Sequence, residues 1–261
     1  MFSWNNATIY FLLIDRFYDE DKCSNHCYGR NLDQEGNIRE DYEKGPAVFH
    51  GGDLKGITKK LKEGYFKDLS IDAIAISPPY EQIHGFISGN VGGANEYHNS
   101  KGFPYYAYHG YWALDYSNID ANFGTKKDFK EFVDAAHRQG IRVVMDIALN
   151  NLGYATMKDT AEYDFGDFKK DWEAYYYGDL KELQGHENDV HDIYKLDSPK
   201  WAEKWWGPDF IRSSVGYEGY DIGDEDGCES SYLGLPDIKT ESEKEIDIPP
   251  ILVTKWKREG R

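Results

Sequence analysis

The clearest pattern in the chain is a helical repeat of apolar residues followed by a continuous apolar run. Apolar side chains recur three and four residues apart, with charged residues between them, at Phe129, Phe132, Val133 and Ala136. This spacing predicts an amphipathic helix over 126–139. Thr125 suits the cap at its start, and Gly140 suits the left-handed position just past its end. The apolar run at 141–145 predicts a strand that is buried on both faces of a parallel sheet.

Two segments nearer the amino terminus show the same kind of pattern. The apolar run at 8–14 predicts a first buried strand, which ends in the polar residues Asp15 and Arg16. Asp53 suits the cap of a second amphipathic helix. The apolar residues of that helix recur four apart, at Ile57, Leu61, Tyr65 and Leu69. A strand at 73–77 follows and stops at two prolines. Helices that alternate with buried strands indicate βαβ units and a parallel sheet.

Two long stretches without a period predict loops. Residues 18–50 are polar, and long loops inside compact domains are often functional or metal-bound. Oxygens for calcium are available from Asp19, Asp21, Asn25 and Asp33. Their spacing matches no EF-hand loop, so solvated loop charge is the favoured interpretation. Glycines interrupt residues 80–107. The histidines His84, His98 and His109 are dispersed there and just beyond it, which favours surface residues over a metal cluster.

Charge and aromatic content narrow the class of ligand. The chain has 261 residues, with 47 acidic and 30 basic side chains and a formal net charge of −17. This balance argues against nucleic acid or an anionic membrane as the main partner. It is compatible with a neutral or cationic ligand, with divalent cations, or with a purely solubilising role. The 21 Tyr and 7 Trp offer flat rings that suit sugars, above all in the cluster Tyr108, Tyr111 and Trp112.

The three cysteines and the absence of long apolar runs limit the remaining possibilities. Cys23 and Cys27 are close enough in sequence to pair, which leaves Cys228 alone. His26 between the first two suggests a zinc site only weakly, because no second pair follows. No apolar run reaches transmembrane length, and no basic leader followed by an apolar core is present.

Polar residues gather where the predicted strand at 141–145 ends. Asp146, Asn150 and Asn151 follow it directly. In parallel α/β sheets and barrels, the chemistry collects at the carboxyl ends of the strands. This edge is therefore the predicted functional region.

Several short motifs occur in a fixed order around that region. They are GGDL at 51–54, YHGYW at 108–112, DY at 115–116, HRQGIRVVMD at 137–146 and LPDI at 235–238. In this order they resemble the α-amylase family, glycoside hydrolase family 13, and most of all its bacterial periplasmic type. The family pattern after the strand-end aspartate closes with Asn-His. Here the pair is Asn150 and Asn151, so the role of the family's histidine does not carry over.

The resemblance implies an α/β fold built as a partial TIM-type (β/α)8 barrel. The first three βα units would be present, with an insertion domain after the third strand. Residues 1–153 would form the amino-terminal part of the catalytic barrel, and 154–240 the insertion. Residues 241–261 would begin the next barrel helix, where the chain is truncated relative to the family.

The resemblance also implies roles for six residues. His109, Tyr111, Trp112 and Asp146 would bind the substrate, with Tyr111 stacked on the sugar beside the scissile bond. Asp146 would hold an arginine of the family's nucleophile strand. Asn150 and Asp237 would be ligands of Ca²⁺, which joins the barrel to the insertion through hard oxygens.

The catalytic carboxyl groups of the family are missing from the chain. Hydrolysis needs a nucleophile and an acid/base across the glycosidic bond. The nucleophile of the family lies in a Gly-hydrophobe-Arg-hydrophobe-Asp run, and no such run occurs here. We therefore expect an amino-terminal fragment of an α-amylase that acts on α-glucans (starch and maltooligosaccharides). The fragment would be either inactive or half of a split enzyme whose barrel a second polypeptide completes.

Two other classes of function stay open. One is a non-catalytic sugar-binding or partner-binding protein on an amylase scaffold, which Asn151 in place of histidine slightly favours. The other is a different reaction of the same family, such as transglycosylation or isomerisation. The chain shows no export signal. A periplasmic or extracellular location would follow from the resemblance if the amino terminus is truncated.

Overall fold

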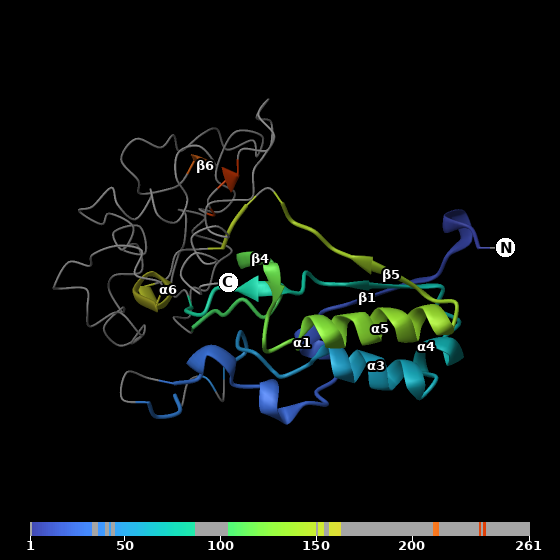
Figure 1. Ribbon diagram of the computed structural model, residues 1–261, viewed down its shortest axis with the longest axis horizontal. Helices are drawn as coiled ribbons and strands as arrows, with labels where there is room; N and C mark the ends of the chain where they lie inside the picture. Colours follow the sequence, from blue (N-terminus) through green and yellow to red (C-terminus); the bar gives the residue numbers. More distant parts are fainter. Residues whose placement is uncertain are drawn as a thin grey trace.

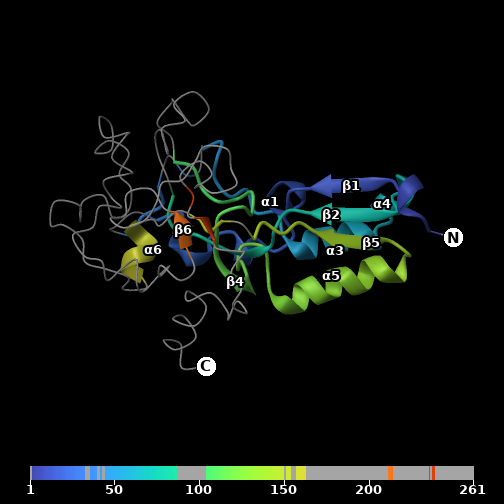
Figure 2. The same ribbon diagram turned by 90° about the horizontal axis from the view of Figure 1, so that it is seen from above.

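The centre of the described structure is a parallel sheet of three strands in the order β1-β2-β5. Its strands are β1 (Ile9–Leu12), β2 (Ala73–Ile76) and β5 (Arg142–Met145). They lie side by side in Figure 2, with Leu12 opposite Ile76 and Ile76 opposite Met145. The computed structural model describes residues 2–32, 36–39, 42, 45–86, 104–149, 151–153, 157–162, 211–213, 235 and 237–238.

Helices between the strands cover one face of this sheet (Figure 1). They are α1 (Ile14–Phe17), α3 (Leu54–Lys62) and α4 (Tyr65–Asp68) between β1 and β2, and α5 (Lys126–Arg138) between β2 and β5. Their apolar side chains and those of the strands form one core, which includes Leu54, Ile57, Leu61, Phe66, Ile74, Ile76, Phe132 and Ala136. The alternation of strand and helix confirms the predicted βαβ units.

The predicted helix 126–139 is confirmed as α5, including both of its ends. The Thr125 hydroxyl accepts the Asp128 amide at 3.2 Å, while the Asp128 carboxylate accepts the Thr125 amide at 2.9 Å. This reciprocal pair satisfies amides that the first helical turn leaves unpaired. Gly140 has a φ of +75°, so the left-handed position past the helix end is filled as expected.

The second predicted helix begins as expected but is broken near its middle. Asp53 caps α3 by accepting the Gly56 amide at 2.6 Å. Gly64 then takes a φ of +88° and separates α3 from α4. This break changes which side chains face the core. Tyr65 and Leu69, predicted as core residues, are exposed, and Phe66 is buried in their place.

The prediction that the strands are buried on both faces is wrong within the described part of the chain. Ile9 is 52% exposed, Phe11 55% and Val144 38%. These residues point away from the helices, because side chains alternate between the two faces of a strand. Among the described residues, only one face of the sheet is covered by helices.

Two segments predicted as loops form an antiparallel pair beyond the parallel sheet. They are β3 (Tyr80–Gln82), inside the predicted loop 80–107, and β4 (Ala113–Ile119), which contains the DY motif at 115–116. The YHGYW motif at 108–112, directly before β4, is called the aromatic loop below. The pairing is irregular, since the partner moves from Ile119 to Asp115 over one residue of β3. The Asp115 carboxylate accepts the Ser117 amide at 2.7 Å inside this bulge.

The other described elements are short. Residues 18–50 carry the 3₁₀ turns η2 (Lys22–Ser24) and η3 (Cys27–Gly29), and η1 (Trp4–Asn6) precedes β1. Further along the chain lie α6 (Met157–Glu162) and the antiparallel pair β6 (Ile211–Ser213) and β7 (Asp237–Ile238). The expected helix start after 250 and Cys228 lie outside the described residues. In the described part of the chain, no helix is both long and apolar enough to cross a membrane.

Candidate functional site

The predicted functional edge is formed where the aromatic loop before β4 meets the end of β5. The Tyr111 hydroxyl donates a hydrogen bond of 2.7 Å to Oδ2 of Asp146. Asp146 is itself fixed, because its amide donates to the Ile76 carbonyl at the end of β2. Both side chains are partly exposed. The structure thus brings together two residues that the sequence placed at this edge.

His109 lies between Tyr111 and Trp112 and contacts both rings. The His109 ring stacks on Tyr111 with 5.7 Å between ring centroids and stands perpendicular to Trp112 at 4.7 Å. The Tyr111 amide donates to Nδ1 of His109 at 3.0 Å, so this nitrogen carries no proton. The partly exposed Tyr111 ring offers an apolar face beside the Asp146 carboxylate, and such a pairing of flat apolar face and polar group suits a sugar ring.

Two pKa shifts in this cluster favour the uncharged forms of His109 and Tyr111. Burial and the nearby Arg16 guanidinium lower the pKa of His109 to about 3. Burial and the hydrogen bond to Asp146 raise the pKa of Tyr111 to about 12. At neutral pH the imidazole is therefore uncharged, and the phenol remains a hydrogen-bond donor.

The short helix α1, which follows the first strand, contributes two residues whose place in the site the sequence did not predict. Arg16 lies over the Tyr108 ring, with 3.8 Å from its guanidinium carbon to the ring centroid. Asp15 is buried beside it and accepts the amides of His50 and Gly51. Burial raises the pKa of Asp15 to about 6, although these amides oppose the shift. Their signal in the sequence was the polar end of the first strand.

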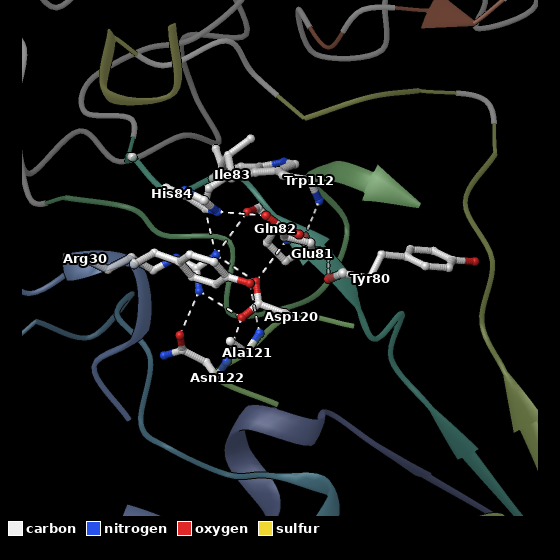
Figure 3. Close-up of polar contacts among 12 residues, drawn as sticks. Arg30, Tyr80, Glu81, Gln82, Ile83, His84, Trp112, Asp120, Ala121 and Asn122 are labelled. Carbon is white, nitrogen blue, oxygen red and sulfur yellow. Dashed lines mark hydrogen bonds and ion pairs between the residues drawn. The ribbon is translucent and has the colours of Figure 1, made fainter. Parts of the chain in front are cut away.

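A buried ion pair lies beneath the aromatic loop, and sequence reasoning missed it completely (Figure 3). Arg30 donates to both oxygens of Asp120, at 2.9 and 2.7 Å, and both side chains are fully buried. Arg30 also donates to Asn122 and to the carbonyls of Gln82 and Ile83. Burial alone would lower the pKa of Arg30, but the Asp120 carboxylate raises it. Arg30 comes from a stretch without periodicity, so no pattern marked it.

His84 corrects the prediction that the histidines of the 80–107 loop lie on the surface. It is 1% exposed, and its ring nitrogens contact Glu81 at 3.1 Å and Glu162 at 2.8 Å. Burial lowers the pKa of His84, but the two carboxylates outweigh it and raise the pKa overall. The His84 amide donates to Asp159 of α6. His84 thus contacts α6 through both its backbone and its ring, and His98 lies outside the described residues.

The predicted calcium ligands are not brought together by the described residues. Asn150 lies outside them, and Asp237 is described only as a backbone position in β7. No group of three or more His, Cys, Asp or Glu residues in the described part could hold a metal ion. Cys23 and Cys27 are free thiols, not a disulfide.

The loop oxygens considered for calcium are partly engaged within the protein. The Asn25 amide donates to Oδ2 of Asp19 at 2.8 Å, and Lys55 pairs with Asp21. Oδ1 of Asp19 and Oδ1 of Asn25 are buried, and neither has a hydrogen-bond partner among the described residues. Asp33 lies outside the described part.

Asn151 occupies the position where the resemblance expected histidine. It is buried, and its amide donates to the Leu152 carbonyl at 3.1 Å, with the Tyr111 carbonyl at 3.5 Å. The Tyr116 hydroxyl lies against the carbonyl oxygens of Ala148 and Asn151. Asn151 therefore contacts the backbone of its own loop and of the aromatic loop.

Sequence comparison gives a single consistent family. Residues 11–242 match the family model "Alpha amylase, catalytic domain". The periplasmic alpha-amylase of Escherichia coli (strain K12) is 39% identical over 255 residues, covering 95% of this chain and 35% of that relative. A cyclomaltodextrin glucanotransferase of Bacillus sp. (strain 38-2) is 30% identical over 224 residues, covering 85% of this chain and 26% of that relative. The chain spans about a third or less of the length of these curated relatives.

Solved structures show likeness in fold. The gamma-CGTase of alkalophilic Bacillus clarkii superposes with a TM-score of 0.53 at 22% identity, over 89% of this chain and 26% of that one. The alpha-amylase of Geobacillus thermoleovorans, solved with acarbose, gives a TM-score of 0.50 at 23% identity, over 92% and 35%. Both are TIM-barrel members of the alpha-amylase family.

The neutral state of His109 predicts a loss of stability in acid. Because its folded pKa of about 3 lies below the ordinary 6.5, the unfolded chain binds the proton more tightly. The contribution of neutral His109 to the free energy of unfolding is complete above pH 6.5 and falls by up to about 1.4 kcal/mol per pH unit toward pH 3. Urea unfolding at several pH values should show a shallower acid slope for His109→Gln. His137 is exposed on α5, so His137→Gln should keep the wild-type slope. Equal slopes for all three proteins would contradict the depressed pKa of His109.

Proposed function

Since this chain belongs to the alpha-amylase family, we propose that it provides the substrate-binding part of a glycoside hydrolase acting on α-glucans such as starch and maltooligosaccharides. One observation carries the proposal, the hydrogen bond from Tyr111 to Asp146. It fixes the edge of an aromatic ring at the carboxyl end of a parallel sheet, where sites form in barrels of this kind. The other face of the ring, not stacked on His109, is then available to a sugar.

The proposed architecture is the first part of a (β/α)8 barrel. The order β1, α3–α4, β2, α5, β5 supplies three parallel strands and the helices between them. We assign residues 1–153 to this part and 154–240 to the insertion after the third strand, with the next helix starting in 241–261. The exposed apolar face of the sheet, with Phe11 and Val144, supports this assignment, because in a closed barrel it faces the packed interior.

Each residue of the aromatic cluster has a proposed role. Tyr111 stacks on the sugar, His109 supports its ring by stacking on it, and Trp112 packs against the His109 ring. Asp146 orients the Tyr111 hydroxyl and leaves its second oxygen, Oδ1, for a neighbouring cation such as an arginine. The neutral imidazole of His109 avoids placing a positive charge against that arginine.

The hydrolytic groups themselves are assigned outside these residues. In the retaining mechanism, one carboxylate attacks the anomeric carbon, while a carboxylic acid protonates the leaving oxygen and later takes a proton from water. No Gly-hydrophobe-Arg-hydrophobe-Asp run occurs in the 261 residues. Asp146 is engaged by Tyr111, so we give it an orienting role and not that of nucleophile. A second polypeptide would be one source of both groups.

A second candidate is sugar binding without turnover. Asn151 favours it, because the side chain at this position contacts the backbone of the loop and is not directed as a free polar group. Transfer of the glycosyl group to a sugar in place of water is a third possibility, since cyclomaltodextrin glucanotransferases are among the relatives. Both alternatives use the same aromatic edge.

Calcium is proposed as the ion that joins the barrel to the insertion. Asn150 and Asp237 would hold it, since amide and carboxylate oxygens are hard ligands that suit Ca²⁺. The neighbouring Asn151 is held by the Tyr116 hydroxyl, which keeps this loop near the end of β5. When bound, the ion would fix the two segments relative to each other. We further propose a periplasmic or extracellular location, which the periplasmic relative supports.

Binding of maltoheptaose tests the proposed function. Calorimetric titration of the 261-residue chain should show binding, and Tyr111→Ala should weaken it about tenfold, because stacking contributes about 1.4 kcal/mol. Tyr65→Ala removes an exposed tyrosine of α4 and should leave the affinity unchanged. Reducing ends should not accumulate. Absence of binding, or equal loss in both variants, would contradict the proposal.

Thermal unfolding tests the calcium site. Calcium at a hundredfold excess over its dissociation constant should stabilise the fold by about 2.7 kcal/mol, which raises the midpoint by several degrees. Asn150→Ala and Asp237→Ala should abolish this shift, whereas Asp19→Asn should retain it. A shift that disappears only in Asp19→Asn would assign the ion to the loop at 18–50 instead.

A further inference from the structure

The backbone next to Tyr111 is held by a side chain and not by a regular strand partner. The Trp112 amide donates to Oε1 of Gln82 at 2.8 Å (Figure 3). In a regular antiparallel pair, such an amide would bond to a backbone carbonyl. The β3–β4 register shifts at Gln82, and the side-chain amide takes over the acceptor role there. The next backbone contact is regular again, since the Ile83 amide donates to the Trp112 carbonyl at 3.0 Å.

The orientation of the Gln82 side chain is determined by its two partners. Its Nε2 donates to the Tyr80 carbonyl at 2.8 Å, so its oxygen must face the Trp112 amide. Gln82 is 0% exposed. Water therefore cannot replace either bond, and a lost partner would leave a buried polar group unsatisfied.

The backbone of Gln82 is fixed by the buried ion pair. Its amide donates to Oδ2 of Asp120 at 2.9 Å, and its carbonyl accepts from Arg30 at 3.0 Å. Gln82 thus uses its backbone on the ion pair and its side chain on the aromatic loop. It connects these two parts of the structure through a side chain, beside the backbone of Ile83, whose carbonyl accepts from Arg30 and whose amide donates to the Trp112 carbonyl.

The loop on the other side of Tyr111 is also tightly placed. Gly110 has a φ of +91°, and a Cβ added there would lie 2.3 Å from the Pro78 carbonyl oxygen. Tyr111 is therefore held between a close backbone approach at Gly110 and the Gln82 bond at Trp112. Small movement of either would shift its ring relative to Asp146.

We infer that Gln82 is a positioning residue for the proposed sugar site. It touches no sugar itself. It sets the place of Tyr111 by holding the Trp112 amide, and so connects the buried Arg30–Asp120 pair with the ligand-binding edge. The expected effect on sugar affinity rests on the proposed function. The geometric part of the inference rests only on the hydrogen bond of the Trp112 amide to Gln82.

Gln82→Met is the direct test, because methionine keeps the length of the side chain and removes the oxygen and the nitrogen that bond to the Trp112 amide and the Tyr80 carbonyl. Maltoheptaose affinity should fall about tenfold relative to wild type. In a Tyr111→Ala background, the same change should cost less than about twofold, because the ring being positioned is gone. A merely structural loss would weaken both backgrounds equally. The control Gln139→Met removes the bond from Gln139 to the Leu61 carbonyl at the end of α5 and should leave affinity unchanged.

Hydrogen exchange of the Trp112 amide tests the geometry without any sugar. The exchange rate should rise at least tenfold in Gln82→Met and stay at the wild-type value in Gln139→Met. If wild type binds no maltoheptaose, the proposed function fails and this amide alone decides the inference. If Gln82→Met does not fold, slow exchange of Trp112 in wild type supports the bond. Fast exchange there, or binding by Gln82→Met as tight as wild type, would overturn it.

Discussion

The buried ion pair between Arg30 and Asp120 is the interaction on which the functional edge depends. A guanidinium and a carboxylate shielded from water stabilise a fold only when their mutual geometry is good and further hydrogen bonds satisfy most of their remaining donors and acceptors. Here the Nη donors of Arg30 also reach Asn122 and the carbonyls of Gln82 and Ile83, while its buried Nε has no partner among the described residues. The Tyr28 and Phe49 rings flank its guanidinium carbon at 4.7 and 4.4 Å. The pair therefore joins three segments far apart in sequence, namely the 18–50 loop, β3 and the end of β4.

The parallel sheet and the buried polar centre around Arg30 and Asp120 have different structural roles. The sheet and its helices form an apolar core that brings the ends of β1, β2 and β5 to one edge. Apolar burial has no direction, so it cannot by itself orient a loop. Directional bonds do this instead, from the ion pair through Gln82 to Trp112 and from Tyr111 to Asp146. The proposed sugar site is thus an aromatic surface at a sheet edge, and burial keeps the His109 imidazole in it uncharged at neutral pH.

The regular elements could be predicted from sequence because their signals are local. The period and both caps of α5 lie within sixteen residues, and the strand-end position of Asp146 follows from the apolar run before it. Other features depend on contacts between distant residues. Gly64 reads as part of a helix until its left-handed backbone is seen, and β3 is three residues long. Arg30 and Asp120 are 90 residues apart, and His84 finds Glu162 across 78. No local pattern encodes these pairs, so the buried polar centre had to come from the structure.

A double-mutant cycle between Arg30 and Asp120 tests the central claim most directly. The free energy of unfolding would be measured by urea for wild type, Arg30→Met, Asp120→Leu and the double variant, beside the exposed pair Lys130–Asp134 treated likewise. Each single change leaves a buried charge unpaired, so a coupling energy of about 3 kcal/mol or more is expected. The exposed pair should give less than about 1 kcal/mol. A coupling for Arg30–Asp120 as small as that of the surface pair would contradict the claim that this buried contact holds the aromatic edge in place.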